Sequence, residues 1–414
     1  MLPWLKIAAL ILTIFPRFIA NPLFWLVLLL IYKQYRRLNR LQMDMFGLEF
    51  TPVGKQVCQS ALFGLAGGLV GSFLMVLVGV SLSRAGIIYV WPLAIFLLLF
   101  SPRFMCFAYA AGIISLVHLI FGFPQLEIPQ LLGLVAVLHM VESLLIYLTG
   151  HLYPIPVITK NPAGQLIGGF NLQKFWPLPV VIMLTVVLDM PELTDDFIRM
   201  PQWWPLIRPQ ELGAAGQEVV YSLFLVTAAL GYSDLALSST PRQKAGRSAV
   251  YLALYSILLL LAAMGASYYA PLLPVAALFS PLGHELVIFL GRREESGKKA
   301  LFTPPARGLM ILAVVPGGLA AKYGLGAGEI ILRLGAREVM SPADLALAPH
   351  QGPPWELVTL EPKDKGYRLK STTIWESAGD WGIIPVPRDN GGPYVRMQRE
   401  GPLLRFLRRL PRKK

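Results

Sequence analysis

The sequence predicts a polytopic α-helical membrane bundle followed by a small soluble α+β domain. Of its 414 residues, 55% are hydrophobic and only 15% are charged, and the mean hydropathy is +0.57. A soluble globular chain carries about a quarter charged residues, so most of this chain is expected to lie in lipid. After Gly291 the polarity changes to that of an ordinary globular domain. The first 291 residues are therefore predicted to form the bundle.

Apolar runs indicate where the transmembrane helices lie. A helix needs about 20 apolar residues to cross the hydrocarbon core of a bilayer. Residues 2–15 are too few to cross and are expected to lie in the interface or to dip into the bilayer. The clear runs are 60–82, 104–123, 130–149, 219–237 and 249–270, and the weaker runs are 18–34, 86–100, 176–190 and 272–290. Together they predict about eight transmembrane helices.

The charges of the loops predict the orientation of the chain. Segments 33–59, 150–175 and 238–248 are basic, whereas 191–218 is acidic. Basic loops stay in the cytoplasm, which places the chain from residue 291 onward on that side. The net charge of +13 lies largely beside hydrophobic stretches. Membrane orientation explains it, and nucleic-acid binding is not expected.

Small residues in one predicted helix indicate close helix packing. Gly64 with Gly68, and Gly67 with Gly71, form two overlapping GxxxG spacings. Such spacings let another backbone approach closely. The partner is either a second copy of the chain or a segment of the same chain, and homo-oligomerisation stays open.

The two cysteines give no sign of a disulfide or of a metal site. Cys58 and Cys106 are far apart in sequence, form no CxxC motif and have no His cluster beside them. Such isolated cysteines are typical of small apolar positions. No metal and no cofactor are predicted from them.

The soluble part has the pattern of strands and short helices expected of a small domain at 303–375. A mixed-charge linker, 292–302, precedes it, and a C-terminal extension, 376–414, follows. Ser341 and Pro342 are predicted to open a helix that runs to Leu347, with Ser341 as its N-cap. The other predicted elements are a buried strand at 308–315, a helical turn at 319–322, a strand at 330–334 and a hairpin from 355–360 to 367–369.

The stretch "VVPGGLAAKYGLGAGEIILRLGAREVMSPADL" in this region resembles the bacterial PDZ family, and the resemblance covers about residues 300–372. PDZ domains bind extended peptides by adding a strand to an exposed sheet edge. The residues 381–384, Trp-Gly-Ile-Ile, are either a further strand or an alternative ligand-facing loop, and all these residues have a simpler interpretation as core. The candidate groove residues implied by the resemblance are Leu309, Met310, Ile311, Leu312, Ala343 and Leu347.

The end of the chain is basic and amphipathic. Its positive face carries Arg405, Arg408, Arg409 and Arg412, and Phe406 belongs to the apolar face. A helix of this kind is predicted to rest on an anionic membrane surface. The alternative is a solvated tail.

Polar residues inside apolar stretches are candidates for catalytic groups. The HExxH zinc motif of intramembrane proteases requires a second His four residues after the first. Here His284 and Glu285 are followed by Ile288 at that place, so a structural pair or docking point is predicted. His139 and Glu142 are three residues apart on one helix face, where they could pair within the bundle or relay a proton. No catalytic residue is predicted.

Three segments together resemble the MinJ family of bacterial division-topology proteins: "NPLFWLVLLLIYKQYRR", "FSPLGHELVIFLG" and the PDZ-like stretch. The resemblance implies a non-enzymatic, multi-pass scaffold of the bacterial cell membrane, enriched at septum and poles. Its implied partners are a pole protein of the DivIVA type and the division inhibitor MinD. The alternatives are a relative of intramembrane proteases or regulator of proteolysis, and a transporter-like bundle with a regulatory PDZ domain.

Overall fold

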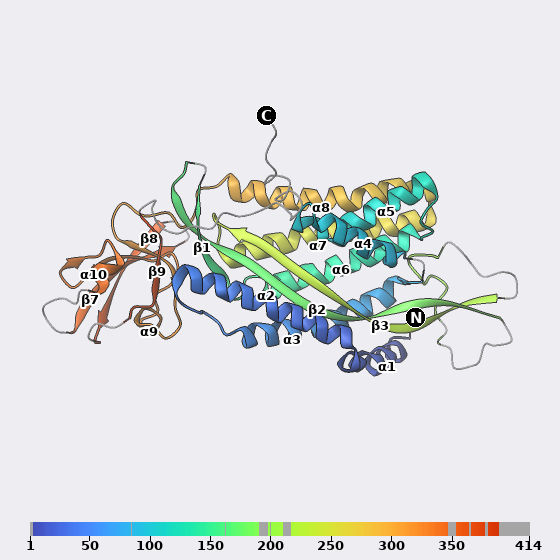
Figure 1. Cartoon of the computed structure of the whole chain (residues 1–414), viewed down its shortest axis with the longest axis horizontal. Coiled ribbons are helices and arrows are strands. Elements are labelled where there is room, and N and C mark those ends of the chain that lie inside the picture. The colour runs from blue at the N-terminus through green and yellow to red at the C-terminus, as the bar shows by residue number, and fades with distance from the viewer. Residues whose placement is uncertain are drawn as a thin grey trace, which may run out of the picture.

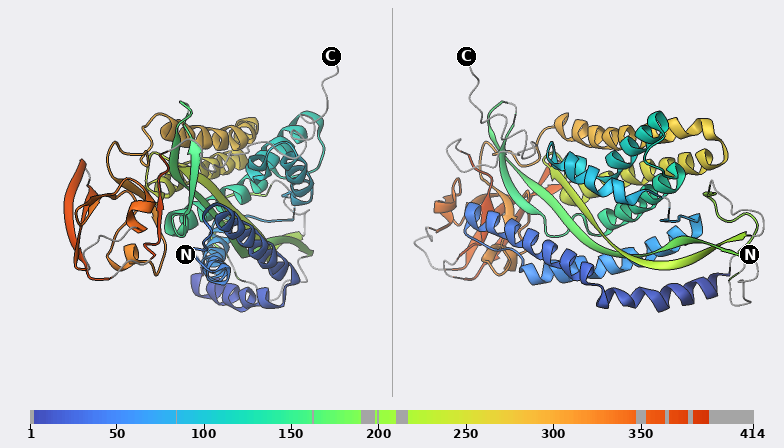
Figure 2. Two further views of the ribbon diagram at one scale, coloured as in Figure 1. Left: turned by 60° about the vertical axis from the view of Figure 1, so that its left-hand side comes forward. Right: turned by 45° about the vertical axis from the view of Figure 1, so that its right-hand side comes forward.

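The computed structural model describes residues 3–83, 85–161, 163–189, 198, 200–209, 217–346, 353–363, 366–376 and 380–388. Helices surround a long, twisted β-hairpin, and a separate sheet domain lies at one end of this helical body (Figure 1). The same arrangement is visible from two further directions (Figure 2). The predicted division into a helical body and a smaller domain is therefore confirmed in outline.

Within the described residues, four helices are long and apolar enough to cross a membrane, or five if one bent pair counts as a single span. The bent pair, Trp4–Ala20 with Pro22–Phe46, turns by 63° at its break. The prediction of about eight spans is thus reduced to four or five. The helices are α1 (Trp4–Ile14), α2 (Pro22–Phe46), α3 (Val53–Val78), α4 (Ile87–Leu98), α5 (Phe107–Phe121), α6 (Ile128–Thr149), α7 (Pro241–Tyr268) and α8 (Leu273–Ser296).

Two predicted transmembrane helices, 176–190 and 219–237, are strands in the structure. They belong to β2 (Leu166–Asp189) and β3 (Gln217–Ala236), which pair antiparallel, and β1 (Ile155–Lys160) pairs with the beginning of β2. The first segment is rich in β-branched residues, and Pro177 and Pro179 would break a helix. The apolar length of the segments was misleading because a buried strand is also apolar on both faces.

Helix α3 lies against the edge of β2 that faces away from β3. A Cβ atom on Gly64 would lie 2.1 Å from the carbonyl oxygen of Pro177, and one on Gly68 would lie 2.0 Å from that of Pro179. Glycine is therefore required at both positions. This close approach shows that these GxxxG glycines pack within one chain.

Side chains satisfy the hydrogen-bonding groups along the same edge of β2. Pro177 and Pro179 have no N–H to donate. The Val181 N–H donates to Ser72 Oγ at 2.8 Å, and the Thr185 N–H donates to Ser83 Oγ at 2.7 Å. An open strand edge is costly in lipid because no water replaces the missing bonds, so this capping lets a strand lie inside the helical body.

Helix α6 lies in the middle of the helical body. Of the long apolar helices it is the most deeply buried, and it is surrounded by α3, α5, α7 and α8. Most of its residues are buried, and its large exposed side chains, Leu144, Tyr147 and Leu148, lie toward its C-terminal end. A polar side chain in the buried part of α6, such as that of His139, therefore meets other protein groups.

The C-terminal domain is a sheet with strand order β8-β7-β5-β4-β9, to which β6 adds beside β5. The predicted strands and short helices of this domain are confirmed. The sheet also includes β9, beyond the boundary expected at residue 375. Its elements are β4 (Leu309–Val314), α9 (Leu319–Lys322), β5 (Ile330–Leu334), β6 (Arg337–Glu338), α10 (Pro342–Ala346), β7 (Trp355–Lys363), β8 (Gly366–Ile374) and β9 (Ile383–Pro385).

The sheet domain is packed onto the helical body. The Gly168 N–H donates to the carbonyl oxygen of Phe302 at 2.8 Å, and the Phe302 and Phe170 rings meet edge to face. A Cβ atom on Gly168 would lie 2.7 Å from Leu312 Cδ1. The segment predicted as a linker is also partly ordered, because α8 continues to Ser296. These contacts hold the domain against the β1–β2 hairpin.

Candidate functional site

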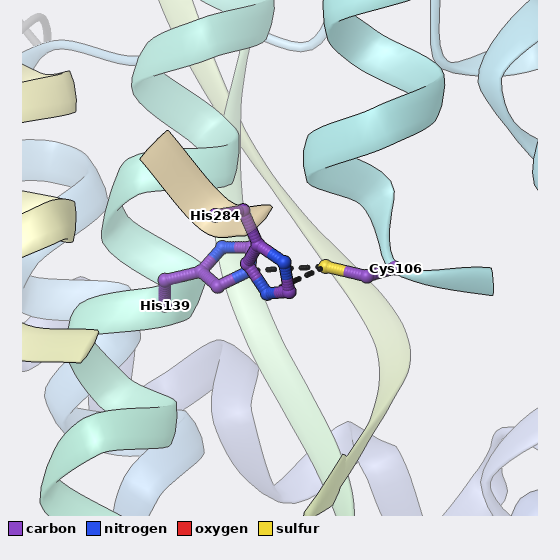
Figure 3. A group of neighbouring side chains, drawn as sticks. All are labelled: Cys106, His139 and His284. Atoms are coloured by element: carbon purple, nitrogen blue, oxygen red, sulfur yellow. Dashed lines mark hydrogen bonds between the residues drawn. The ribbon is translucent and has the colours of Figure 1, made fainter. Parts of the chain in front are cut away.

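Cys106, His139 and His284 converge inside the helical body (Figure 3). Cys106 immediately precedes α5, His139 lies on α6 and His284 lies on α8. The Cys106 Sγ atom is 3.1 Å from His139 Nε2 and 3.5 Å from His284 Nε2. One potential ligand atom from each residue lies within 4.8 Å of the other two. In the described part of the chain, this is the one grouping of three such residues within metal-binding reach.

Small residues bring α5 and α8 close enough to form the cluster. A Cβ atom on Gly112 would lie 2.3 Å from Pro281 Cδ and 2.9 Å from the carbonyl oxygen of Ala277. The Ser280 hydroxyl donates to the carbonyl oxygen of Ala108 at 2.8 Å. Because the contacts at Ser280 and Pro281 lie about one turn before His284, they fix the position of the His284 side chain along the helix axis relative to Cys106.

Helix α7 supports the cluster from another side. The Tyr255 hydroxyl donates to the carbonyl oxygen of Ser280 at 2.8 Å, and the Tyr255 ring meets the His139 and His284 rings edge to face. Tyr109 meets His284 in the same way. The two imidazoles are thus held in an aromatic enclosure.

The hydrogen bond of His139 determines which of its nitrogens faces the sulfur. Its Nδ1 lies 2.7 Å from the carbonyl oxygen of Val135. A carbonyl oxygen only accepts, so Nδ1 must carry the proton. The unprotonated Nε2 then directs its lone pair at Cys106.

His284 is arranged differently. Its Nδ1 is buried and has no hydrogen-bond partner among the described residues, whereas its Nε2 faces Cys106. An ordinary core histidine has its ring nitrogens satisfied. This unpaired nitrogen is the feature that the packing of the helices leaves unexplained.

Glu285 anchors α8 and does not face the cluster. It accepts a hydrogen bond from the Tyr109 hydroxyl at 2.6 Å and pairs with Arg103 at 3.0 Å. Both partners lie at or next to the start of α5, so this carboxylate ties α8 to that end of the helix. The structural role predicted for His284 and Glu285 fits Glu285, which binds Tyr109 and Arg103. His284 instead faces Cys106.

The expected contact between His139 and Glu142 is replaced by the bond of His139 to Val135. His139 therefore faces the backbone of its own helix and Cys106, and not Glu142.

No family model, no curated protein and no solved structure matches this chain. The cluster must therefore be interpreted from its geometry. Sequence reasoning singled out His139 and His284 as polar residues in apolar stretches, but it assigned Cys106 to ordinary packing. The cluster was missed because Cys106 is 33 residues from His139 and 178 from His284.

The strand predicted to bind peptides is internal in the structure. Leu309 and Met310 of β4 pair with β5, and β9 pairs along the other side of β4 from Ile311 onward. All four predicted strand residues, Leu309, Met310, Ile311 and Leu312, are buried. They were expected to form the open edge of the sheet, but β9 forms that edge.

The predicted helix of the groove lies beside β9. Ala343 of α10 is exposed, and the Trp381 indole N–H donates to the carbonyl oxygen of Leu345 at 3.1 Å. Leu347 lies outside the described residues, as do Arg405, Phe406, Arg408, Arg409 and Arg412 of the predicted membrane-surface tail. The helix and the terminal strand are thus neighbours, with Trp381 between them.

The start of α10 is fixed by Asp344. Its carboxylate accepts hydrogen bonds from the Met340 N–H at 3.0 Å, the Ser341 N–H at 2.8 Å and the Ser341 hydroxyl at 2.9 Å. The Met340 N–H bond, followed by the Ser341 hydroxyl, lowers the pKa of the Asp344 carboxyl. The ionised carboxylate therefore positions the helix at neutral pH.

Proposed function

We propose that this protein is a membrane scaffold that recruits other proteins through its C-terminal sheet domain. The observation that supports this proposal most directly is the position of β9 at the end of the sheet, beside α10, in a domain packed onto the membrane body. A recruiting domain held in this way presents its binding edge at a fixed place above the membrane.

The sheet domain is proposed to act as a PDZ-like module that adds a peptide strand to β9. Gly382 and Val386 direct backbone groups toward β4, at 2.7 and 2.9 Å from their partners. Alternate residues of a strand face opposite sides, so Ile383 directs its N–H and carbonyl oxygen away from β4, and Pro385, which has no N–H, directs only its carbonyl oxygen there. This side is available for peptide addition, with α10 as the neighbouring wall.

The opposite end of the sheet is less suited to the same role. Strand β8 carries Arg368 and Lys370, and charged residues on a terminal strand disfavour pairing with another chain, as Pro385 does at one position of β9. Leu369 is nevertheless exposed between them. It therefore serves as the comparison position in a test.

Site-specific photocrosslinking in cells tests the assignment of the binding edge. A photoreactive amino acid replacing Ile383 is expected to capture a discrete set of proteins, and the same group replacing Leu369 is not. Deletion of residues 300–414 should abolish recruitment of these partners. Capture from position 369 with none from 383 would contradict peptide addition at β9.

By resemblance, the recruited proteins are of the DivIVA and MinD types, and the process is placement of the division septum. The basic loops beside the sheet domain support a cytoplasmic location for it. A fluorescent fusion of the full chain is expected to concentrate at septa and poles. An even distribution around the whole membrane would contradict the division role while leaving the scaffold proposal to the crosslinking experiment.

A further inference from the structure

We propose that Cys106, His139 and His284 bind a single zinc-class divalent ion inside the helical body. In a tetrahedral zinc site, the sulfur and nitrogen ligands lie about 3.5 Å apart, as Zn–S and Zn–N distances of roughly 2.3 and 2.0 Å require. The observed separations from Cys106 Sγ are 3.1 Å to His139 Nε2 and 3.5 Å to His284 Nε2. Both imidazoles therefore already lie near ligand spacing from the sulfur, and all three ligand atoms lie within 4.8 Å of one another.

The chemistry of the three donors selects the class of ion. Thiolate and imidazole suit zinc and its spectroscopic substitute cobalt, whereas magnesium and calcium prefer oxygen ligands. Figure 3 shows that both imidazoles turn toward the same sulfur. The three side chains leave a fourth position for water or another ligand.

The surroundings of His139 prepare it for metal binding. Metal-ligating histidines almost always donate their other ring N–H to a carboxylate, a carbonyl oxygen or water, which fixes the tautomer. The bond from Nδ1 to Val135 does this at 2.7 Å. The Nε2 lone pair is consequently available to an ion placed between the rings and Cys106.

Hydrogen bonds alone would give the two rings different roles. A thiol has one hydrogen and can donate it to only one of the two imidazoles. If Cys106 donates to His139, the ring of His284 must donate to sulfur through Nε2. An ion shared by the three side chains instead lets both Nε2 atoms act as ligands; the Nδ1 of His284 then carries the proton and still has no partner among the described residues.

Charge balance also favours a divalent ion at this depth. On binding, the Cys106 thiol forms a metal–sulfur bond and releases its proton, which leaves one negative charge on the ligand set. The thiolate offsets one of the two positive charges, which limits the cost of placing an ion in an apolar body.

Metal analysis of the full-length protein tests the site. Protein extracted from membranes and washed with a weak chelator is expected to retain about one zinc ion per chain. Cys106→Ser, His139→Gln and His284→Gln should each lose the metal. Cys58→Ser and His118→Gln are matched controls and should retain it, because Cys58 is exposed on α3 and His118 bonds Pro124. Metal-free native protein, copper in place of zinc, or ligand variants that keep their zinc would overturn the proposal.

A spectroscopic and a chemical readout cover the case in which the ligand variants fail to fold. Native protein loaded with cobalt is expected to show a thiolate-to-cobalt charge-transfer band, which Cys58→Ser retains. In the zinc-loaded native protein, a strong chelator should accelerate alkylation of Cys106 and leave that of Cys58 unchanged. Absence of the cobalt band, or alkylation of Cys106 that is indifferent to the chelator, would contradict metal ligation.

Discussion

At the scale of single residues, a glycine determines whether the buried cluster can form. Gly112 lets α5 approach α8 so closely that a Cβ atom would lie 2.3 Å from Pro281 Cδ. Because a ring of proline cannot turn aside as a flexible side chain does, the helices themselves would have to separate. The position of Cys106 beside His284 therefore depends on a residue that has no chemistry of its own.

Replacing Gly112 by alanine is expected to destabilise the helical body by about 1–3 kcal/mol, the usual cost of overfilling a packed core. Thermal unfolding of the purified protein in detergent measures the effect. Gly246→Ala is the matched control, since a Cβ atom at this position of α7 meets nothing within 4 Å. That change should be neutral or stabilise the helix by about 0.5–1 kcal/mol. Equal unfolding temperatures for the two variants would contradict the role of Gly112.

The same scale shows how far sequence reasoning could identify the site. His139 and His284 stood out because ionisable residues within membrane helices are rare. Cys106 did not, because an isolated cysteine is usually a small apolar residue. What joins the three is the packing of α5, α6 and α8, which no local pattern around any one of them encodes.

At the scale of elements, the β2–β3 hairpin is the main departure from the predicted fold. The apolar sequence correctly indicated helices long enough to cross a membrane, but its length did not distinguish a buried strand from a helix. Local signals were present: alternate prolines at 177 and 179, and β-branched residues from Val180 onward. By contrast, the strands of the C-terminal domain were predictable because glycine and proline turns separate them.

The edge of β2 gives a prediction for this element. Ser72 Oγ accepts the Val181 N–H at 2.8 Å and donates to the carbonyl oxygen of Gly68 at 2.7 Å. Ser72→Ala should cost about 1–3 kcal/mol of stability, because the Val181 N–H is left buried without a partner. Denaturation followed by circular dichroism measures this cost.

Ser267→Ala is the control for Ser72→Ala. The Ser267 hydroxyl donates to the carbonyl oxygen of Met264 in its own helix, at 2.7 Å. Its loss therefore leaves no backbone N–H of a strand without a partner. A change within about 0.5 kcal/mol is expected for it. If Ser72→Ala were equally mild, the side-chain capping of β2 would not be what stabilises the strand inside the helical body.

At the scale of the whole molecule, the sheet domain and the segment 200–209 lie at opposite ends of the helical body. The Leu206 N–H donates to the carbonyl oxygen of Val78, the last residue of α3, at 3.0 Å. The sheet domain instead contacts the β1–β2 hairpin through Phe302 and Gly168, and the Leu301 N–H donates to Leu237 at the end of β3. Figure 1 shows that the helices between these ends run along the long axis of the molecule.

We expect the two ends to face opposite sides of the membrane. Single cysteines replacing the exposed residues Gln202 and Ala336 report on them, in a parent that carries Cys58→Ser and keeps the half-buried Cys106. A membrane-impermeant maleimide should label position 202 in intact cells and position 336 only after permeabilisation. The parent without either cysteine measures background labelling. Labelling of position 336 in intact cells would place the sheet domain outside the cell, beyond reach of cytoplasmic partners. It would also contradict the orientation predicted from the basic loops near this domain, which are expected to lie in the cytoplasm.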